Sequence, residues 1–223
     1  MRRLMSTVEG DWNAVALLAI ALVVGTLLVG ALVTEAAPLF GPPSNETSAS
    51  PEGVGLSQHS YQASLSDCIQ RLDSLYWRTR PGKEREMLAS ACDELATRAV
   101  AAMPSFSFAW FAGASAASAL GDIDQMNLSL LRSELTGPSE QWIAEARVDL
   151  SEAHRKDLDA GAARAEDADL KILAQGQSGI GSIVRRYLSD PEFRPRITSL
   201  IETLPATVQQ HFLDTIQRMG HLS

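Results

Sequence analysis

The chain opens with one long apolar segment, and helical periodicity follows it. Every side chain from Ala14 to Val33 is apolar or glycine except that of Thr26. At a rise of roughly 1.5 Å per residue, a helix of this length is about 30 Å long, which matches the hydrocarbon core of a bilayer. Because lipid offers the backbone no hydrogen-bond partners, a lone segment of this kind crosses a membrane only as a helix. The pattern predicts a transmembrane helix over residues 13–34.

The basic residues around this segment predict its orientation. Arg2 and Arg3 precede it, and the next Lys or Arg after it is Arg71. Because basic flanking residues stay in the cytoplasm, residues 1–12 are expected to be cytoplasmic and the chain beyond the membrane to lie outside the cytoplasm. A cleaved signal peptide is the alternative, although the apolar run exceeds the roughly 7–15 residues of a signal peptide's apolar core.

A linker and then a long helical region follow the apolar segment. Residues 35–60 are rich in Pro, Ser and Gly without apolar periodicity, which predicts a flexible linker. Residues 61–223 have helical apolar spacing throughout, and Gly and Pro mark the turns. Helices are expected near residues 62–80, 84–102, 105–120, 122–135, 139–158, 166–188, 191–203 and 205–219. The expected fold class is all-α, with one transmembrane helix ahead of a helical domain.

The two cysteines are predicted to form a disulfide. Cys68 and Cys92 lie at similar distances before and after the turn at residues 80–82, so an antiparallel helical hairpin brings them to nearly the same depth. A bond between them would add roughly 3 kcal/mol of stability, and it suits an oxidising compartment. Two buried free thiols on facing helices are the alternative.

The segment from Phe106 to Leu120 is almost entirely apolar, and serine is its only polar residue. A helix that is apolar all round is buried on every side, and small residues let its neighbours approach closely. Five residues in and after this segment bear on a resemblance to the tetratricopeptide-repeat family, which implies that they pack between helix pairs. They are Trp110, Ala114, Gly121, Pro138 and Trp142.

The spacing of the first four of these residues resembles a tetratricopeptide repeat, a motif of about 34 residues. The sequence departs from that motif at Ala117 and Met126, which stand where the family has its Tyr and second Ala. One repeat cannot cover its own apolar face, so the resemblance implies about three stacked helix pairs. The cysteine hairpin and the helix that carries Trp142 would supply the others. A tetratricopeptide-like (TPR-like) helical-hairpin bundle or short α-solenoid is therefore expected.

The order of anchor, linker and helical domain also resembles single-pass periplasmic proteins of alphaproteobacterial envelopes. The residues that carry this resemblance are Ala109–Trp110, Leu131–Ser133, Gly137–Pro138 and Trp142. The resemblance implies a bacterial inner-membrane protein that helps in surface-polysaccharide (exopolysaccharide) assembly or secretion. It carries over no catalytic residue.

Composition narrows the classes of partner. The chain has 19 Lys and Arg against 27 Asp and Glu, a net charge of −8, which argues against nucleic acid or anionic lipid as a partner. Four scattered histidines lack partners at the spacing of a metal site, so no metal and no cofactor is expected. They are His59, His154, His211 and His221.

Three further groups are assigned structural roles. The glycine-rich stretch over residues 177–182 lacks the preceding strand and the Lys of a phosphate-binding loop, so a kink or loop is expected there. Glu166, Asp167 and Asp169 are expected on one exposed turn at a helix start, with glycoside cleavage as the alternative. A group of four arginines is expected to be exposed and to pair with nearby acids, with phosphate or an acidic polymer as the alternative ligand. It comprises Arg185, Arg186, Arg194 and Arg196.

Together these observations favour a non-enzymatic, membrane-anchored periplasmic scaffold or adaptor that binds envelope proteins. The alternative is an accessory subunit of a larger inner-membrane complex, held through its transmembrane helix. An enzyme that acts on surface glycans has less support, because it would require a convergent pair of carboxylates. Glycan contact has no support from the residues.

Overall fold

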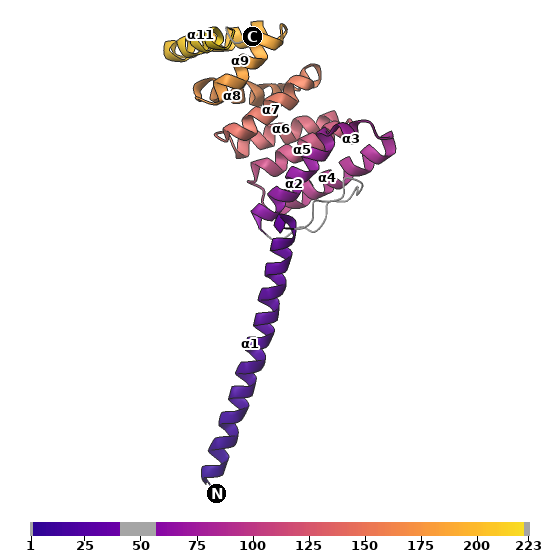
Figure 1. Ribbon diagram of the computed structural model, residues 1–223, viewed down its shortest axis with the longest axis vertical. Helices are drawn as coiled ribbons and strands as arrows, with labels where there is room; N and C mark the ends of the chain where they lie inside the picture. Colours follow the sequence, from indigo (N-terminus) through magenta and orange to yellow (C-terminus); the bar gives the residue numbers. More distant parts are fainter. Residues whose placement is uncertain (1, 41–56, 221–223) are drawn as a thin grey trace. The chain divides into compact units, whose positions relative to one another are not determined.

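The computed structural model describes residues 2–40 and 57–220, and its regular structure within these ranges is helical (Figure 1). The expectation of an all-α protein is confirmed for these residues. The chain divides into two compact units, Met1–Ser64 and Leu65–Ser223.

The first unit contains helix α1 (Arg2–Phe40) and the beginning of α2 (Gln58–Asp73). Helix α1 extends beyond the expected transmembrane segment into residues 35–40, where Glu35 and two alanines favour the helix although Pro38 does not. The predicted linker is therefore helical at its start, and α2 includes its last residues, while residues 41–56 lie outside the described part of the chain. The Glu35 carboxylate accepts hydrogen bonds from the amide and hydroxyl of Ser57, at 2.7 and 2.6 Å.

One stretch of α1 is apolar enough to span a membrane. Ala14–Ala36 has a mean hydropathy of 2.8, and none of its most apolar window is buried. Its large apolar side chains, such as Leu18 and Leu28, are mostly exposed. By length and composition this segment could span a membrane.

The second unit is a series of short helices joined by tight turns. After α2, the helices are α3 (Leu75–Arg78), α4 (Gly82–Ala102), α5 (Ser107–Leu120), α6 (Ile123–Thr136), α7 (Gln141–Ala153), α8 (Ala160–Gln175), α9 (Gly179–Ser189), α10 (Phe193–Glu202) and α11 (Ala206–Gly220). A short 3₁₀ helix, η1, spans Arg155–Asp157. These bounds agree with most of the expected helices to within a few residues.

Two of the expected helices are each divided in two. Ser74 ends the first, and its hydroxyl accepts a hydrogen bond from the amide of Trp77 (3.3 Å) at the start of α3. Gly176 and Gly179 divide the second into α8 and α9. A Cβ at Gly179 would lie 2.7 Å from the carbonyl oxygen of Leu173, so only glycine fits this close approach without rearrangement. The expected kink in the glycine-rich stretch is thereby confirmed.

The helices of the second unit pack in two rows. Helices α5, α7 and α9 form one row, in which each contacts the next, and α6, α8 and α10 form the other in the same way. Contacts of α5 with α6, of α7 with α8 and of α8 with α9 join the rows, while α4 packs against α5 and α11 against α9. Helix contacts thus run both along each row and between the rows.

Small residues allow α5 to lie close to its neighbours. Ala109, Ala112, Ala116 and Ala117 are buried on the faces of α5 that meet α4 and α6. At Gly113, an added Cβ would lie 3.6 Å from the Ala96 Cβ and 3.7 Å from the Ser129 Oγ, so the helices are already at packing distance there. The side of α5 that carries Ser115 and Ser118, however, is less completely covered by neighbouring helices.

Candidate functional site

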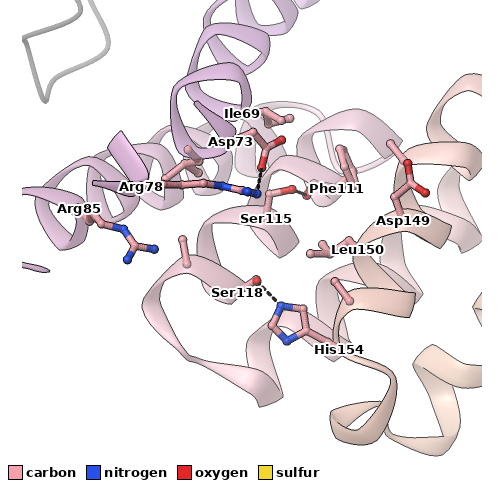
Figure 2. A pocket seen from close by; sticks show the side chains of 14 residues that line it. Ile69, Asp73, Arg78, Arg85, Phe111, Ser115, Ser118, Asp149, Leu150 and His154 are labelled. Carbon is pink, nitrogen blue, oxygen red and sulfur yellow. Dashed lines mark hydrogen bonds and ion pairs between the residues drawn. The ribbon is translucent and has the colours of Figure 1, made fainter. Parts of the chain in front are cut away.

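A hollow of about 630 Å³ lies on that side of α5, and we call it the groove (Figure 2). Helices α2, α3, α4, α5 and α7 all contribute to it. Its lining residues are Ile69, Leu72, Asp73, Arg78, Arg85, Phe111, Ser115, Ser118, Ala119, Ala146, Asp149, Leu150, Ala153 and His154. Its volume falls within the roughly 300–1,000 Å³ that is usual for ligand pockets.

Helical spacing brings the lining residues of α5 and α7 to the groove. Phe111, Ser115 and Ser118 lie three or four residues apart and therefore share one face of α5. On α7, Ala146 and Leu150 share a face in the same way. Ser115 and Ser118 are half-buried, so the expectation that α5 is buried on every side is wrong along this stripe.

Apolar and polar groups meet in the groove. Ile69 and Leu72 come from α2, and Phe111 and Leu150 add apolar surface from α5 and α7. Figure 2 shows Arg78 and Arg85 on one side, Leu150 and His154 on the other, and the serine hydroxyls between them. Apolar lining with a few convergent polar groups is the usual composition of a binding pocket.

The charged groups of the groove differ in how they are neutralised. Asp149 forms an ion pair with Arg186 of α9. Asp73 lies 3.9 Å from Arg78, and both side chains are well exposed. Arg85 forms no ion pair with any described residue, and its side chain is exposed. The groove therefore holds a cation that the described chain does not neutralise.

Ser118 and His154 form a hydrogen bond at one end of the groove. The Ser118 Oγ lies 2.7 Å from His154 Nε2, and His154 Nδ1 lies 3.8 Å from a carboxylate oxygen of Asp157. That order of residues is found in nucleophilic triads, but the His–Asp distance exceeds a hydrogen bond. Ser118 also lies in the last turn of α5, where the helix dipole is negative and disfavours an oxyanion. We interpret the contact as a brace between α5 and α7.

The five residues predicted to pack between helix pairs have different environments. Ala114 is fully buried, and Gly121 ends α5 with a positive φ of 76° that favours glycine. Trp110 is only half-buried, with its indole N–H donated to the carbonyl of Pro104 at 2.9 Å. Pro138, in the turn before α7, is exposed. Trp142 is 55% exposed, although its ring lies 5.2 Å from that of Phe108.

The cysteine pair has the geometry that a disulfide needs. The Cα atoms of Cys68 and Cys92 are 5.7 Å apart, and the two sulfurs are at bonding distance. The bond joins α2 to α4 one residue before Ile69, a lining residue. It therefore fixes the part of α2 that forms a wall of the groove.

The acidic group in α8 is in a different environment from the one predicted. Glu166 and Asp169 are 1% exposed rather than solvated, whereas Asp167 remains partly exposed. The prediction of an exposed helix start was wrong because α8 begins at Ala160, so these acids lie in its interior turns and face neighbouring helices.

Arginines from other helices neutralise these buried acids. Arg147 of α7 donates from Nε to Asp169 at 2.7 Å and from a second nitrogen to its other oxygen. Glu166 accepts from Arg155 at 2.6 Å and from Arg196 at 2.9 Å. Arg196 also contacts Glu152. No sequence pattern identified Arg147 as a partner, because the two ends of this ion pair are 22 residues apart.

Most of the predicted arginine group pairs with acids, as expected. Arg185 and Arg186 contact Glu145 and Asp149 of α7, and Arg196 contacts the acids of α8. Arg194 instead donates to backbone carbonyls at the end of α9. Arg196 is more buried than predicted, at 20% side-chain exposure.

Burial changes the acidity of the central carboxyls. Desolvation raises the pKa of Glu166 to about 7, with Arg155 and Arg186 opposing it and Asp167 and Asp169 adding to it. Desolvation also raises the pKa of Asp169, against the hydrogen bond and charge of Arg147. Within the described ranges, no cluster of three or more His, Cys, Asp or Glu side chains is placed to hold a metal ion. His221 lies outside those ranges.

Comparisons with protein-family models, with curated proteins and with solved structures returned no match to this chain. The assignment of function therefore rests on the geometry of the groove and on the properties of α1.

None of the residues that line the groove was predicted from the sequence to bind a ligand, and these include Arg78, Arg85, Ser118 and His154. One signal was present, because Ser115 and Ser118 interrupt an otherwise apolar helix on a single face. The arginines gave no comparable signal, since exposed arginines are common on helices.

Proposed function

We propose that this protein is a non-enzymatic adaptor anchored in the bacterial inner membrane, whose periplasmic helical domain binds a segment of another envelope protein in the groove. The groove between α2, α5 and α7 is the observation that carries this proposal. Two rows of stacked helices in a TPR-like arrangement would present such a concave surface to a peptide or a partner helix.

The membrane anchor in this proposal is α1, with Arg2 and Arg3 in the cytoplasm. Its apolar segment is long enough to cross a bilayer, and basic residues flank only its N-terminal side. The Cys68–Cys92 pair supports the periplasmic assignment, since disulfides persist in oxidising compartments.

A binding role has more support than catalysis because the buried carboxylates are already engaged. Glu166 and Asp169 contact arginines from α7, η1 and α10. Carboxylates held in this way brace helices against one another and do not converge on the groove. The proposal therefore assigns the ion pairs to the scaffold and the groove to recognition.

The proposal is tested with a photo-crosslinking amino acid placed at Ser115, in the groove, within the full chain in its native membrane. We expect a crosslink to one partner protein, and no such product from the same amino acid at Lys171, which is exposed on α8 outside the groove. The variant Ala146→Trp fills the groove and should abolish the crosslink while the helical content is unchanged.

Replacement of Ala14–Val33 by an unrelated apolar helix, with Glu35 and its hydrogen bonds to Ser57 kept, distinguishes the adaptor from its alternative. An adaptor keeps its crosslink at Ser115, because the apolar segment of α1 only localises the domain. Loss of the partner after this replacement, with the domain still folded, would instead assign the chain as an accessory subunit held through α1 in a larger inner-membrane complex. Equal crosslinking from Ser115 and Lys171 would contradict a groove-based function.

A further inference from the structure

The charges of the groove indicate the chemistry of its ligand. Both aspartates that line the groove pair with an arginine of the same chain. Asp149 pairs with Arg186, and Asp73 pairs with Arg78. Arg85, by contrast, forms no ion pair with a described residue and lines the same hollow. The charge that remains available to a ligand is therefore positive, although the whole chain carries −8.

The apolar lining sets a second requirement. Ile69 and Leu72 on α2, with Phe111 on α5 and Leu150 on α7, offer apolar contact on two sides of the hollow. A volume of about 630 Å³ holds several side chains but not a folded domain. A ligand that satisfies both requirements has apolar side chains next to a single anionic group.

We propose that the groove binds an amphipathic peptide segment of a partner protein, which places one Asp or Glu side chain against Arg85 and its apolar side chains between α2, α5 and α7. This inference rests on the proposed adaptor function and adds the chemistry of the partner.

The net charge of the chain restricts the partner further. A strongly acidic surface would be repelled by a protein of net charge −8. A lone carboxylate among apolar residues avoids most of that repulsion and still pairs with Arg85. A second copy of this chain is a poorer occupant for the same reason, since two copies repel each other.

Selection from a library of displayed random 12-residue peptides tests the inference on the full chain in lipid nanodiscs. We expect the selected peptides to share an Asp or Glu flanked by apolar residues. The Arg85→Glu variant should instead select peptides with Lys or Arg at that position. It should bind the peptides that the wild-type protein selected at least about tenfold more weakly. Arg98→Glu is the matched control, an exposed arginine on the same helix that does not line the groove, and it should leave the selection unchanged.

The outcomes separate this inference from the proposed function. If the selected peptides show no preference for Asp or Glu, or if the Arg85→Glu variant selects the same peptides as the wild type, the carboxylate assignment is overturned. The groove then remains as a binding site. Peptides that bind equally well to Ala146→Trp, or a library that yields no binder, overturn both. A nanodisc particle with two copies that depends on Arg85 would assign the groove to self-association and overturn the inference.

Discussion

At the scale of single residues, the buried ion pair between Arg147 and Asp169 joins three helices. Both side chains are 1% exposed, and the Arg147 guanidinium also donates to the carbonyl of Ser133 at 3.3 Å. Removal of two charges from water is costly, and close hydrogen bonds on both sides offset that cost. A charge left alone at this depth has no such compensation.

Arg147→Met should therefore lower the free energy of unfolding by about 3–5 kcal/mol, because Asp169 is left buried without its partner. Urea unfolding of the full chain in detergent, followed by tryptophan fluorescence and by circular dichroism, measures the change. The control Arg185→Ala removes a pair that is 64% and 45% exposed and should cost less than about 1 kcal/mol. Equal effects of the two substitutions would contradict this account.

Glu166 makes stability depend on pH. Its pKa is raised to about 7, so the folded chain holds its proton more tightly than the unfolded chain does. The stabilisation is complete below the unfolded pKa and is lost as the pH rises through about 7. The charged groups around it are Arg155 on η1, Arg196 on α10, Arg186 on α9, and Asp167 and Asp169 on its own helix. Arg196 in turn contacts Glu152 on α7.

We expect the free energy of unfolding to fall by about 2 kcal/mol between pH 5 and pH 8. Burial also raises the pKa of Asp169, which adds a change of the same sign. Glu166→Gln should flatten the dependence around pH 7, while Glu202→Gln, an exposed control on α10, should keep it. Urea titrations at several pH values test this, and an unchanged slope in Glu166→Gln would refute the assignment.

At the scale of helices, close contacts fix where one element ends and the next begins. The turn between α8 and α9 lets Gly179 approach the backbone of Leu173, and the turn after α5 requires the positive φ of Gly121. The Cys68–Cys92 bond fixes α2 against α4 in a comparable way. The shape of the groove depends on these helix positions as much as on its lining residues.

Gly179→Ala should destabilise the domain by about 1–3 kcal/mol, because the new Cβ would lie 2.7 Å from Leu173 backbone atoms. Gly181→Ala, two residues later in α9, is the matched control. Its nearest neighbour would be the flexible end of Arg185 at 3.7 Å, so helix propensity should make it neutral or stabilising by about 0.5–1 kcal/mol. Thermal unfolding followed by circular dichroism compares them, and a stabilising Gly179→Ala would show that the turn can relax.

At the scale of the whole molecule, the function that we propose depends on which side of the membrane holds the helical domain. A reporter that is active only after export, fused after Ser223, should be active. A reporter that requires the cytoplasm should be inactive in the same position, because basic residues ahead of an apolar segment, here Arg2 and Arg3, favour a cytoplasmic N-terminus. The opposite pattern would reverse the topology and remove the periplasmic partner from the proposal.

The sequence by itself predicted the apolar segment of α1, the all-helical class, the cysteine pair and most helix bounds of the described chain. These features depend on local patterns: a run of apolar residues, a repeat of three to four residues, and Gly or Pro at turns. Even Cys68 and Cys92 required only one hairpin turn to be placed correctly.

Only the tertiary structure decided which polar residues are buried and which aromatic residues are exposed. Glu166 and Asp169 are buried because Arg155, Arg196 and Arg147, located 11, 30 and 22 residues away, reach them across helix contacts. The groove likewise joins residues from five helices. Burial and pocket shape depend on contacts distant in sequence, and local periodicity carries no information about which helices meet.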